Sequence, residues 1–503
     1  MATVVGILDR DSWSARTDNI VVADPAAKTL TWVPRDLWCP ALGDRINEAF
    51  CLAGFAGLFH ALRVLGIQCD HGLVLRRSAT EHAAAKISVE VPVTEPLDFL
   101  YPLAPLRPIE QGHKMISFRP PAERLENERL HQWVGARRGE SPKSSDLDRI
   151  TRQQVLLRAL LEQPFDFKSV VAEPDLVRIS AAAALAELAS VESSWRMNAV
   201  ADLRYETIDG KSVLVKRDEP LRPADTESPQ LAVLVLALGA PSTAVETIRS
   251  LQAQDLAVEV VVVNSGGGGM AQKLARQGID VTVLDREECL NPGAARNIGI
   301  NVTTAPLLAF LAADSVVNPG WARRLVFVHQ AGVAATGSAL ENPHPHNPIA
   351  WAGHFASWHR WVTASLRGGV SYERRLFDTY GLYRDDLPFG EEREFLARLP
   401  PELRPDPSVK IRVIRLNPTR LSELISQQYL LGAQVNGIRN DPANSACSFS
   451  LWRAPLERAW RACRNVKNRA AIFLALPLIP IALATYCLGG LAGHLAKSRD
   501  RRP

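Results

Sequence analysis

The 503-residue sequence predicts an α/β protein of two domains followed by an apolar C-terminal segment. Three observations support this prediction. Apolar runs at Leu231–Leu238, Val258–Val263 and Leu307–Ala312 each end in a polar or glycine-rich turn, as buried parallel strands do. Residues 1–222 alternate strand-like and helical patterns. Ala470–Gly493 contains no charged residue, which is unusual for a helix in water.

Length and composition limit the classes of protein that this chain can belong to. A chain of 503 residues exceeds one ordinary domain, and its 47% apolar and 22% charged residues are typical of globular proteins. The net charge of +4 is too small to favour nucleic-acid binding. The seven cysteines are scattered without a CxxC pair, which favours reduced thiols on the cytosolic side.

The first predicted domain spans residues 1–222. Its clearest patterns are the strand-like runs Val4–Leu8, Asn19–Ala23 and Leu30–Val33 and the helical stretches Asp44–Leu65 and Arg149–Leu161. This mixture of short strands and longer helices predicts an α/β or α+β domain.

Arginine-rich clusters, most with a neighbouring carboxylate, occur at five places in this domain. They are Asp9-Arg10, Arg16-Thr17-Asp18, Pro34-Arg35-Asp36, Arg137-Arg138 and Asp146–Gln154. The planar guanidinium suits phosphate oxygens, and paired carboxylates suit Mg²⁺. In a helix, Arg149, Arg152 and Gln153 share one face and can present their donors to one anion. Surface salt bridges are the alternative for each cluster taken alone.

Segments of this domain resemble, in order, the LytR-CpsA-Psr family: ILDR, ARTDNIVVADPAAKTLTWVPRDLW, DRINEAF, GIQCDHGLVL and DLDRITRQQVLLRALL. Members of that family transfer polyprenyl-diphosphate-linked glycopolymers to cell-wall acceptors. The resemblance implies that Asp9 and Asp18 hold Mg²⁺. It implies that the diphosphate is bound by Arg16, Arg35, Arg45, Arg137, Arg149, Arg152 and Gln153. Gly135-Ala136-Arg137 stands where the family has an RxR pair, so transfer activity and simple lipid-diphosphate binding both stay open.

A linker separates the two domains. The segment Arg217–Pro229 has the prolines and mixed charges of a linker, and we place the linker proper at 223–229. The second domain, 230–445, begins with the three apolar runs. Ligands of such sheets bind beyond the carboxyl ends of the strands, where the turns after these runs collect.

Motifs in the second domain resemble the family 2 glycosyltransferases, which use nucleotide sugars. The matching pieces, in the family's order, are Leu238-Gly239, Val263–Gly266, Gly293–Asn297, Phe310–Asp314 and Gly390–Phe395. The resemblance implies the GT-A fold, a Rossmann-like nucleotide-diphospho-sugar transferase fold. Two positions depart from the family pattern. Ala312 replaces the first Asp of the Asp-x-Asp metal motif, and Asn264 replaces the acid that contacts the nucleobase.

The same resemblance assigns roles to residues at the turns. It implies donor binding by Gly239, Asn264, Ser265, Arg296 and Asn297, a Mg²⁺ or Mn²⁺ ligand at Asp314, and catalysis by Glu392 with Glu391 beside it. A metal at this carboxylate would stabilise the departing diphosphate. Two adjacent carboxylates raise at least one pKa, which suits a general base.

Each of these assignments has a structural alternative. Asp314 can instead cap the turn that follows it, and the two glutamates can cap the helix that they begin. Arg296 can form an ion pair with Asp285 or Glu288.

The last part of the chain predicts membrane attachment. Residues 451–467 place tryptophans on one helical face and arginines on the other, as an interfacial helix or a helix packed on the domain would. The apolar part of 470–496 fits a single span, a re-entrant segment or a buried core helix. The start MATVVGILDR lacks a signal-peptide pattern, so the expected location is the cytosolic face of the inner membrane.

The sequence therefore predicts a membrane-associated glycosyltransferase of bacterial cell-surface polysaccharide synthesis. Its expected partners are a UDP-sugar or another nucleotide sugar, a polyprenyl-linked or other glycan acceptor, and membrane lipid, with no nucleic acid. The first domain would bind or transfer polyprenyl-diphosphate-linked glycan. One alternative is a phosphotransferase whose second half only binds glycan, and another is a membrane scaffold without activity.

Overall fold

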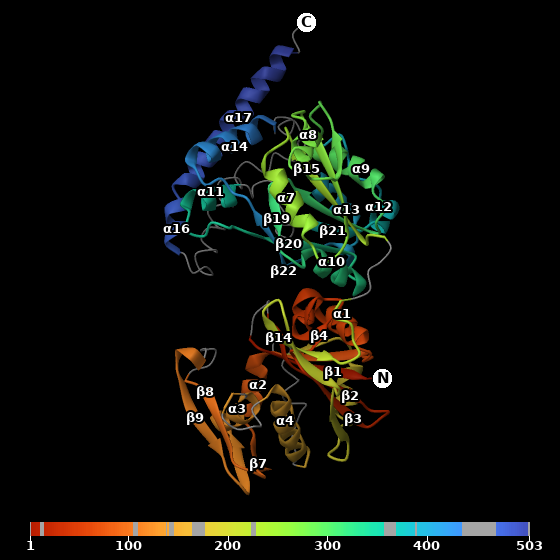
Figure 1. The fold of residues 1–503 in the computed structure, drawn as a ribbon, viewed down its shortest axis with the longest axis vertical. Helices are drawn as coiled ribbons and strands as arrows, with labels where there is room; N and C mark the ends of the chain where they lie inside the picture. Colours follow the sequence, from red (N-terminus) through yellow and green to blue (C-terminus); the bar gives the residue numbers. More distant parts are fainter. Residues whose placement is uncertain are drawn as a thin grey trace. The chain divides into compact units, whose positions relative to one another are not determined.

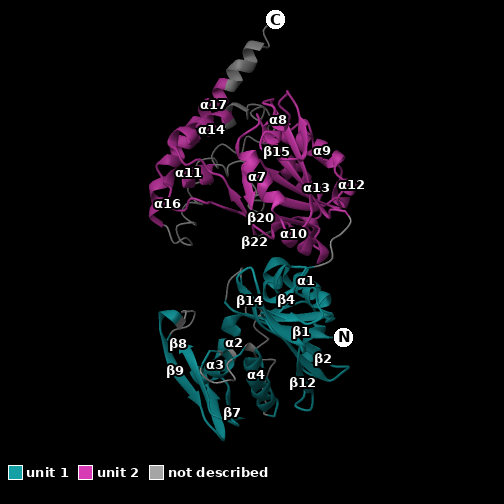
Figure 2. Cartoon of the chain, in the orientation of Figure 1, with its two compact units in different colours: residues 1–223 teal, residues 224–503 magenta. Residues whose placement is uncertain are grey.

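The computed structural model describes residues 2–10, 15–103, 109–136, 138–139, 145–162, 177–222, 228–356, 369–387, 390–434 and 469–500. The chain divides into two compact units, Met1–Pro223 and Ala224–Pro503 (Figure 2). Both units combine strands and helices, so the mixed α/β class predicted from the sequence is confirmed. The predicted helix over 451–467 and the side chain of Arg137 lie outside the described residues.

The main sheet of the first unit has the order β11-β6-β1-β2-β3-β12 among the described residues (Figure 1). Its strands are β1 Thr3–Leu8, β2 Thr17–Asp24, β3 Thr29–Val33, β6 His71–Leu75, β11 Val177–Ile179 and β12 Arg196–Ala199. Strand β1 pairs antiparallel with β2 and parallel with β6, so this sheet is mixed. Val4, Ile20 and Val22 are buried in its core.

Short hairpins and helices complete the first unit. The paired strands are β4 Trp38–Cys39 with β5 Asp44–Arg45, β7 Ser88–Pro92 with β10 Ala122–Glu126, β8 Leu97–Pro102 with β9 His113–Phe118, and β13 Leu203–Ile208 with β14 Lys211–Lys216. The helices are α1 Ala49–Val64, α2 Arg77–Ala84, α3 Asn127–Gly135, α4 Asp146–Leu161 and α6 Ala183–Leu188. The helix predicted from Asp44 begins only at Ala49, because Asp44 and Arg45 pair with Trp38-Cys39.

The second unit is built on a sheet of order β17-β16-β15-β18-β21-β20-β22-β19 within the described residues. Its strands are β15 Leu231–Leu238, β16 Val258–Ser265, β17 Thr282–Asp285, β18 Leu307–Ala312, β19 Ser315–Val317, β20 Ala335–Glu341, β21 Val370–Glu373 and β22 Asp406–Arg415. The first four strands of that order are parallel, and the three predicted apolar runs all belong to them. Their register places Asn264 beside Asp285 and Leu236 beside Ala312, so the polar turns meet at one sheet edge.

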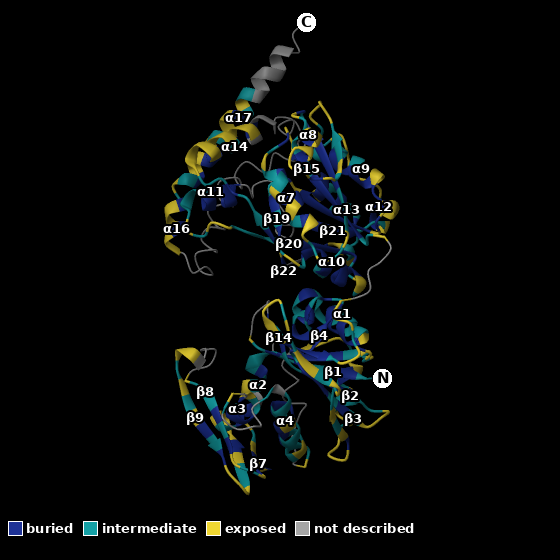
Figure 3. Cartoon of the chain, viewed as in Figure 1, coloured by how far each residue is buried: buried dark blue, intermediate teal, exposed yellow. Residues whose placement is uncertain are grey.

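Helices surround this sheet. They are α7 Thr243–Gln252, α8 Met270–Ala275, α9 Pro292–Val302, α10 Trp321–Gln330, α11 Pro348–Ala356, α12 Arg375–Tyr380, α13 Glu391–Arg398, α14 Leu421–Gln434, α16 Arg469–Ala475 and α17 Leu478–Asp500. Strands β15 and β18 are buried along most of their length, whereas α14 and α17 show exposed residues along their outer sides (Figure 3).

The predicted membrane segment is a broken helix. Within the described chain, no one helix has both the length and the apolar character needed to cross a membrane. Arg469–Ala475 and Leu478–Ala492 meet these requirements only as a pair, and the pair is bent by 41°.

Candidate active sites

Backbone hydrogen bonds join the turn after β15 to the end of β16, and the turn after β16 to the segment after β17. The N–H of Gly239 donates to the carbonyl of Ser265 (2.8 Å), and the N–H of Gly266 donates to the carbonyl of Glu288 (2.9 Å). Gly239 has a φ of +63°, a backbone conformation that glycine adopts without strain. These links hold Gly239 and Ser265, two of the predicted donor-binding residues, next to each other at the carboxyl edge of the sheet.

The side chain of Asn264 ties these turns together and is fully buried. Its Oδ1 accepts from the N–H of Ala240 (3.0 Å), and its Nδ2 donates to the carbonyl of Gly267 and to Asp285 Oδ1 (both 2.8 Å). The amide therefore has its hydrogen bonds satisfied inside the protein. Asn264 thus holds the turns in place, and its direct contact with the donor stays a prediction.

Arg296 on α9 is buried between two glutamates at the start of α13. Its guanidinium donates to Glu391 Oε1 through Nη1 and to Glu392 Oε1 through Nη2, the latter at 2.7 Å. Its Cζ lies 5.7 Å from the centre of the Phe310 ring. Its charge is thus paired with two buried carboxylates, and its role in donor binding stays a prediction. The pairing also differs from the alternative partners Asp285 and Glu288.

Burial and the two neighbouring charges determine the pKa of Glu392. Burial raises the pKa of Glu392 to about 7, the Arg296 charge opposes the rise, and the charge of Glu391 adds to it. A carboxyl with a pKa near neutrality can accept and release a proton under physiological conditions. The two predicted catalytic residues therefore lie together, and Arg296 holds both of them.

The residues around Arg296 in the GAARN motif join α9 to the chain segment before α13. The side-chain amide of Asn297 donates to the carbonyl of Tyr383 (2.8 Å) and accepts from its N–H (3.1 Å). A Cβ at Gly293 would overlap the carbonyl oxygen of Arg384, so this position requires glycine. The amide of Asn297 thus fixes the neighbouring backbone, and its role in donor binding stays a prediction.

Asp314 follows β18 and forms an ion pair across the sheet edge. Its Oδ2 accepts from Arg415 Nη2 at 3.1 Å, and its carbonyl accepts from the N–H of Leu416 at 2.8 Å. Sequence reasoning missed Arg415, because it is simply the last residue of strand β22 and belongs to no motif. The pairing places a fixed positive charge at the predicted metal ligand.

A divalent metal bound at Asp314 would need additional ligands from neighbouring groups. No cluster of three or more His, Cys, Asp or Glu side chains suited to a metal occurs among the described residues. Asp314 offers one carboxylate, and Ala312 offers none. Mg²⁺ at nucleotide phosphates is commonly held by one or two carboxylates, with phosphate and water completing the shell. Asp314 therefore fits a metal that takes its remaining ligands from a bound diphosphate and water.

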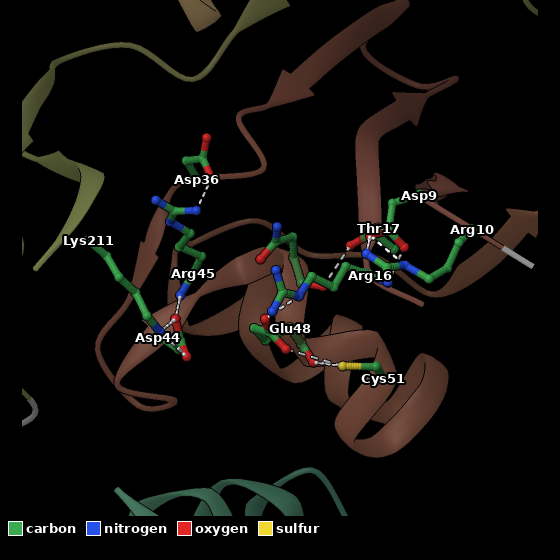
Figure 4. Close-up of polar contacts among 11 residues, drawn as sticks. Asp9, Arg10, Arg16, Thr17, Asp36, Asp44, Arg45, Glu48, Cys51 and Lys211 are labelled. Carbon is green, nitrogen blue, oxygen red and sulfur yellow. Dashed lines mark hydrogen bonds and ion pairs between the residues drawn. The ribbon is translucent and has the colours of Figure 1, made fainter. Parts of the chain in front are cut away.

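In the first unit, Arg35 lies between two carboxylates. It pairs with Asp18, and its Nε lies 3.5 Å from Asp36 Oδ2. Asp36 also pairs with Arg45 Nη1 at 3.0 Å (Figure 4). Partial burial raises the pKa of Asp18, but the charges of Arg35 and Arg149 outweigh it and lower the pKa. Three of the predicted phosphate-binding arginines thus surround two carboxylates contributed by β2 and the turn after β3.

A second group of charges lies around Asp9. The N–H of Arg16 donates to Asp9 Oδ1 (3.0 Å), Arg10 Nη2 lies 2.9 Å from Asp9 Oδ2, and Arg16 Nε lies 2.5 Å from Glu48 Oε1 (Figure 4). Sequence reasoning missed Glu48, although it stands in the DRINEAF segment that drew attention to Arg45. The predicted metal ligands Asp9 and Asp18 therefore each have a guanidinium as a direct neighbour.

The donors predicted to converge on one anion from α4 are separated. Arg152 is buried, its Nε donates to the carbonyl of Trp133 (3.2 Å), and its Cζ lies 4.5 Å from the centre of the Phe99 ring. Burial lowers the pKa of Arg152 to about 10. Gln153 instead accepts from Asn19 Nδ2 at 3.1 Å. The guanidinium of Arg152 thus contacts the core of the domain, and its role in phosphate binding stays a prediction.

Comparison with known families covers both units. Residues 3–214 match the LytR_cpsA_psr family, and residues 232–379 match Glycosyl transferase family 2. Each match lies within one of the two compact units, so the chain is similar to a LytR_cpsA_psr domain joined to a family 2 glycosyltransferase domain. The family 2 match includes Arg296 and Asp314 but ends before Glu391, Glu392 and Arg415.

Individual relatives are similar to parts of this chain. Succinoglycan biosynthesis protein ExoU of Rhizobium meliloti (strain 1021) is 26% identical over 191 residues, covering 33% of this chain and 56% of that protein. The match thus spans little more than half of that relative. Mannosyltransferase PcManGT from Pyrobaculum calidifontis, solved with GDP-Man and Mn2+, is 17% identical over 53% of this chain and 88% of that chain, with a TM-score of 0.35. TagU of B. subtilis is 14% identical over 43% and 90%, with a TM-score of 0.30.

Proposed function

We propose that the family 2 glycosyltransferase domain, with the GT-A fold, transfers a sugar from a nucleoside-diphosphate sugar to an acceptor hydroxyl in polysaccharide synthesis. The observation that carries the proposal is the cluster of Arg296, Glu391 and Glu392. It joins a carboxyl with a pKa of about 7 to Arg296, whose Cζ lies 5.7 Å from the ring centre of Phe310, on the strand that leads to Asp314. The named role of the Rhizobium relative in succinoglycan biosynthesis supports the product class.

Glu392 acts as the general base in this proposal. Its ionised carboxylate accepts the proton of the acceptor hydroxyl, whose oxygen bonds to the anomeric carbon as the bond from that carbon to the diphosphate breaks. Arg296 holds both glutamates in place. A divalent cation bound at Asp314 would supply positive charge to the leaving diphosphate. Arg415 supplies a guanidinium at the same carboxylate, and guanidinium forks suit phosphate oxygens.

A screen of nucleotide-sugar donors tests this function. The purified full chain is incubated with UDP-, GDP- and dTDP-sugars and a polyprenyl-linked glycan acceptor, with and without Mg²⁺ or Mn²⁺, and nucleoside diphosphate release is measured. Glu392→Gln should lower acceptor-dependent release by about 10²–10⁴-fold. Glu394→Gln is the matched control, since Glu394 lies on the same helix but pairs with Arg398 (3.0 Å). Full activity of Glu392→Gln would remove the proposed base.

We further propose that the LytR_cpsA_psr domain binds a polyprenyl-diphosphate-linked glycan through Arg35, Arg45 and Arg149, with the chain at the cytosolic face of the inner membrane. The three guanidinium groups already gather around carboxylates, and a diphosphate offers the same kind of acceptor oxygens. Basic residues in the C-terminal segment and the apolar helices α16 and α17 support the membrane location.

A second candidate function is phosphotransfer by the first domain, with the second domain binding glycan only. The observation that favours it is the incomplete metal motif, in which Ala312 lacks a carboxylate and Asp314 is already paired with Arg415. Loss of turnover in Asp314→Ala and Glu392→Ala, with turnover kept in Arg35→Ala, would favour sugar transfer. The opposite pattern would favour phosphotransfer.

A further inference from the structure

Helices α16 and α17 expose an apolar face. Five of their large apolar side chains are 43–64% exposed: Phe473, Leu474, Ile481, Leu488 and Leu491. No charged residue interrupts the sequence from Ala470 to Gly493. A helix that faces water normally carries polar residues on its outer side, and a continuous exposed apolar face marks a contact surface.

The opposite side of these helices is packed on the family 2 domain. Ile472, Ile479 and Leu483 are buried in one cluster with Trp351 and Phe355 of α11. One side of α16 and α17 is therefore packed against the rest of the protein. The apolar part of α17, Leu478–Ala492, is about 22 Å long at 1.5 Å per residue, which is shorter than the bilayer core of about 30 Å.

Two glycines allow the backbones of α17 and α14 to pack in direct contact. A Cβ on Gly432 would overlap the carbonyl oxygen of Tyr486, and a Cβ on Gly489 would overlap that of Tyr429. The pairing of a later residue of α14 with an earlier residue of α17 makes the two helices antiparallel. Figure 1 shows α14 lying along α17. A membrane or partner that contacts α17 must therefore also contact α14.

Helix α14 extends the apolar face and is itself amphipathic. Leu421, Ile425 and Tyr429 are exposed at four-residue spacing, which places them on one stripe. Ser422 and Ser426 are exposed next to this stripe, and Leu430 and Glu423 are exposed on the far side of the helix. We call the apolar stripe of α14 together with the exposed apolar residues of α16 and α17 the docking face: Leu421, Ile425, Tyr429, Phe473, Leu474, Ile481, Leu488 and Leu491.

The distribution of charge along the chain indicates which partner the docking face would contact. Residues 451–503 contain ten basic and two acidic residues, a net charge of +8, whereas the whole chain carries only +4. All of the excess positive charge thus lies in the last tenth of the sequence, next to the apolar stretch. Basic residues beside an apolar helical face are attracted to anionic lipid, and tyrosine is favoured at the membrane–water interface.

We propose that the docking face enters one leaflet of an anionic bilayer, with α14 lying in the plane of the interface, and that α16 and α17 do not cross the membrane. The proposal makes α14, which lies outside the apolar stretch, part of the membrane-binding surface. It rests on the membrane association proposed above and does not depend on sugar transfer.

Flotation of the full chain with vesicles tests the proposal. Vesicles contain phosphatidylcholine alone or phosphatidylcholine mixed with phosphatidylglycerol. Wild type should float with the anionic vesicles and be released by high salt or alkaline carbonate. Replacing Ile425 and Tyr429 together by Glu should lower the bound fraction by at least about tenfold, since two apolar side chains lose their burial in lipid. Val302→Glu, at an exposed apolar position on α9, should bind as wild type does.

Three outcomes would overturn the proposal. Wild-type binding by the double variant would exclude α14 from the docking face, and resistance of the wild type to carbonate would indicate a spanning anchor. A wild-type dimer that the double variant splits, without vesicle binding by either, would make the face an interface between copies. Thermal unfolding and nucleoside diphosphate release with a soluble acceptor are measured on the same variants. Retained release with lost flotation separates membrane docking from the catalytic assignment.

Discussion

Each unit gathers arginines and carboxylates, but burial gives the two clusters different properties. In the second unit Arg296 pairs with Glu391 and Glu392, and the three side chains are only 6–10% exposed. In the first unit the exposed fractions are larger: 12% for Asp36, 16% for Arg35, 27% for Arg45 and 39% for Asp18. Water can take the place of a partner in the exposed cluster, whereas a buried charge that loses its partner stays unpaired. The buried cluster should therefore be a fixed structure, and the exposed one a site where an anion can exchange with a carboxylate.

The largest effect that this comparison predicts is on stability. Arg296→Met leaves two carboxyl groups buried without their cation and should lower the free energy of unfolding by about 3–5 kcal/mol. Urea denaturation followed by near-ultraviolet circular dichroism measures the change. Arg384→Met is the control, because Arg384 and Asp386 are 53% and 60% exposed. That control should change stability by about 1 kcal/mol or less. Equal effects of the two substitutions would show that burial does not distinguish them.

The second prediction concerns pH. The folded-state pKa of Glu392 is about 7, above the value near 4.5 of a free glutamate, so the folded protein binds this proton more tightly. The contribution of Glu392 to stability is therefore greatest below about pH 4.5 and is lost as the pH rises to about 7. Sugar transfer should show the opposite trend and increase as Glu392 ionises through about pH 7. Unfolding and rate profiles of wild type and Glu392→Gln check both, and an unchanged profile in the variant contradicts the assignment.

The sequence predicted the strands better than the side-chain pairs that join distant parts of the chain. Buried parallel strands are continuous apolar runs, so Leu231–Leu238 and Leu307–Ala312 were predicted with the bounds that the structure shows. The glutamates that bind Arg296 lie 95 and 96 residues further along, and Arg415 lies 101 residues after Asp314. Hydrophobic periodicity contains no information on such pairings. Arg296 was therefore assigned to the donor, when its long-range partners are carboxylates.

The third prediction addresses the exposed cluster. Arg35→Gln removes a cation from Asp18 and Asp36 and should weaken binding of a polyprenyl diphosphate by about 10–100-fold, the value of one hydrogen bond to a charged group. Fluorescence titration with a labelled short-chain polyprenyl diphosphate measures this affinity. Arg119→Gln is the control, since Arg119 pairs with Asp98 at an exposed position. Unaltered affinity in Arg35→Gln would contradict a diphosphate site at this cluster.

The smallest effect should come from Arg45→Lys, which keeps the positive charge. Arg45 uses the two arms of its fork, one to Asp36 Oδ1 (3.0 Å) and one to the carbonyl of Ser212 (2.6 Å). A lysine ammonium keeps the charge but is a point donor, so it should lose one of these bonds and about 0.5–1.5 kcal/mol of stability. Diphosphate affinity should change less than about threefold, because the positive charge remains. Arg45→Gln keeps much of the size without the charge and should weaken binding clearly more than lysine does. If lysine and glutamine weaken binding equally, the geometry of the guanidinium matters more than its charge, and the cluster would be as rigid as the one around Arg296.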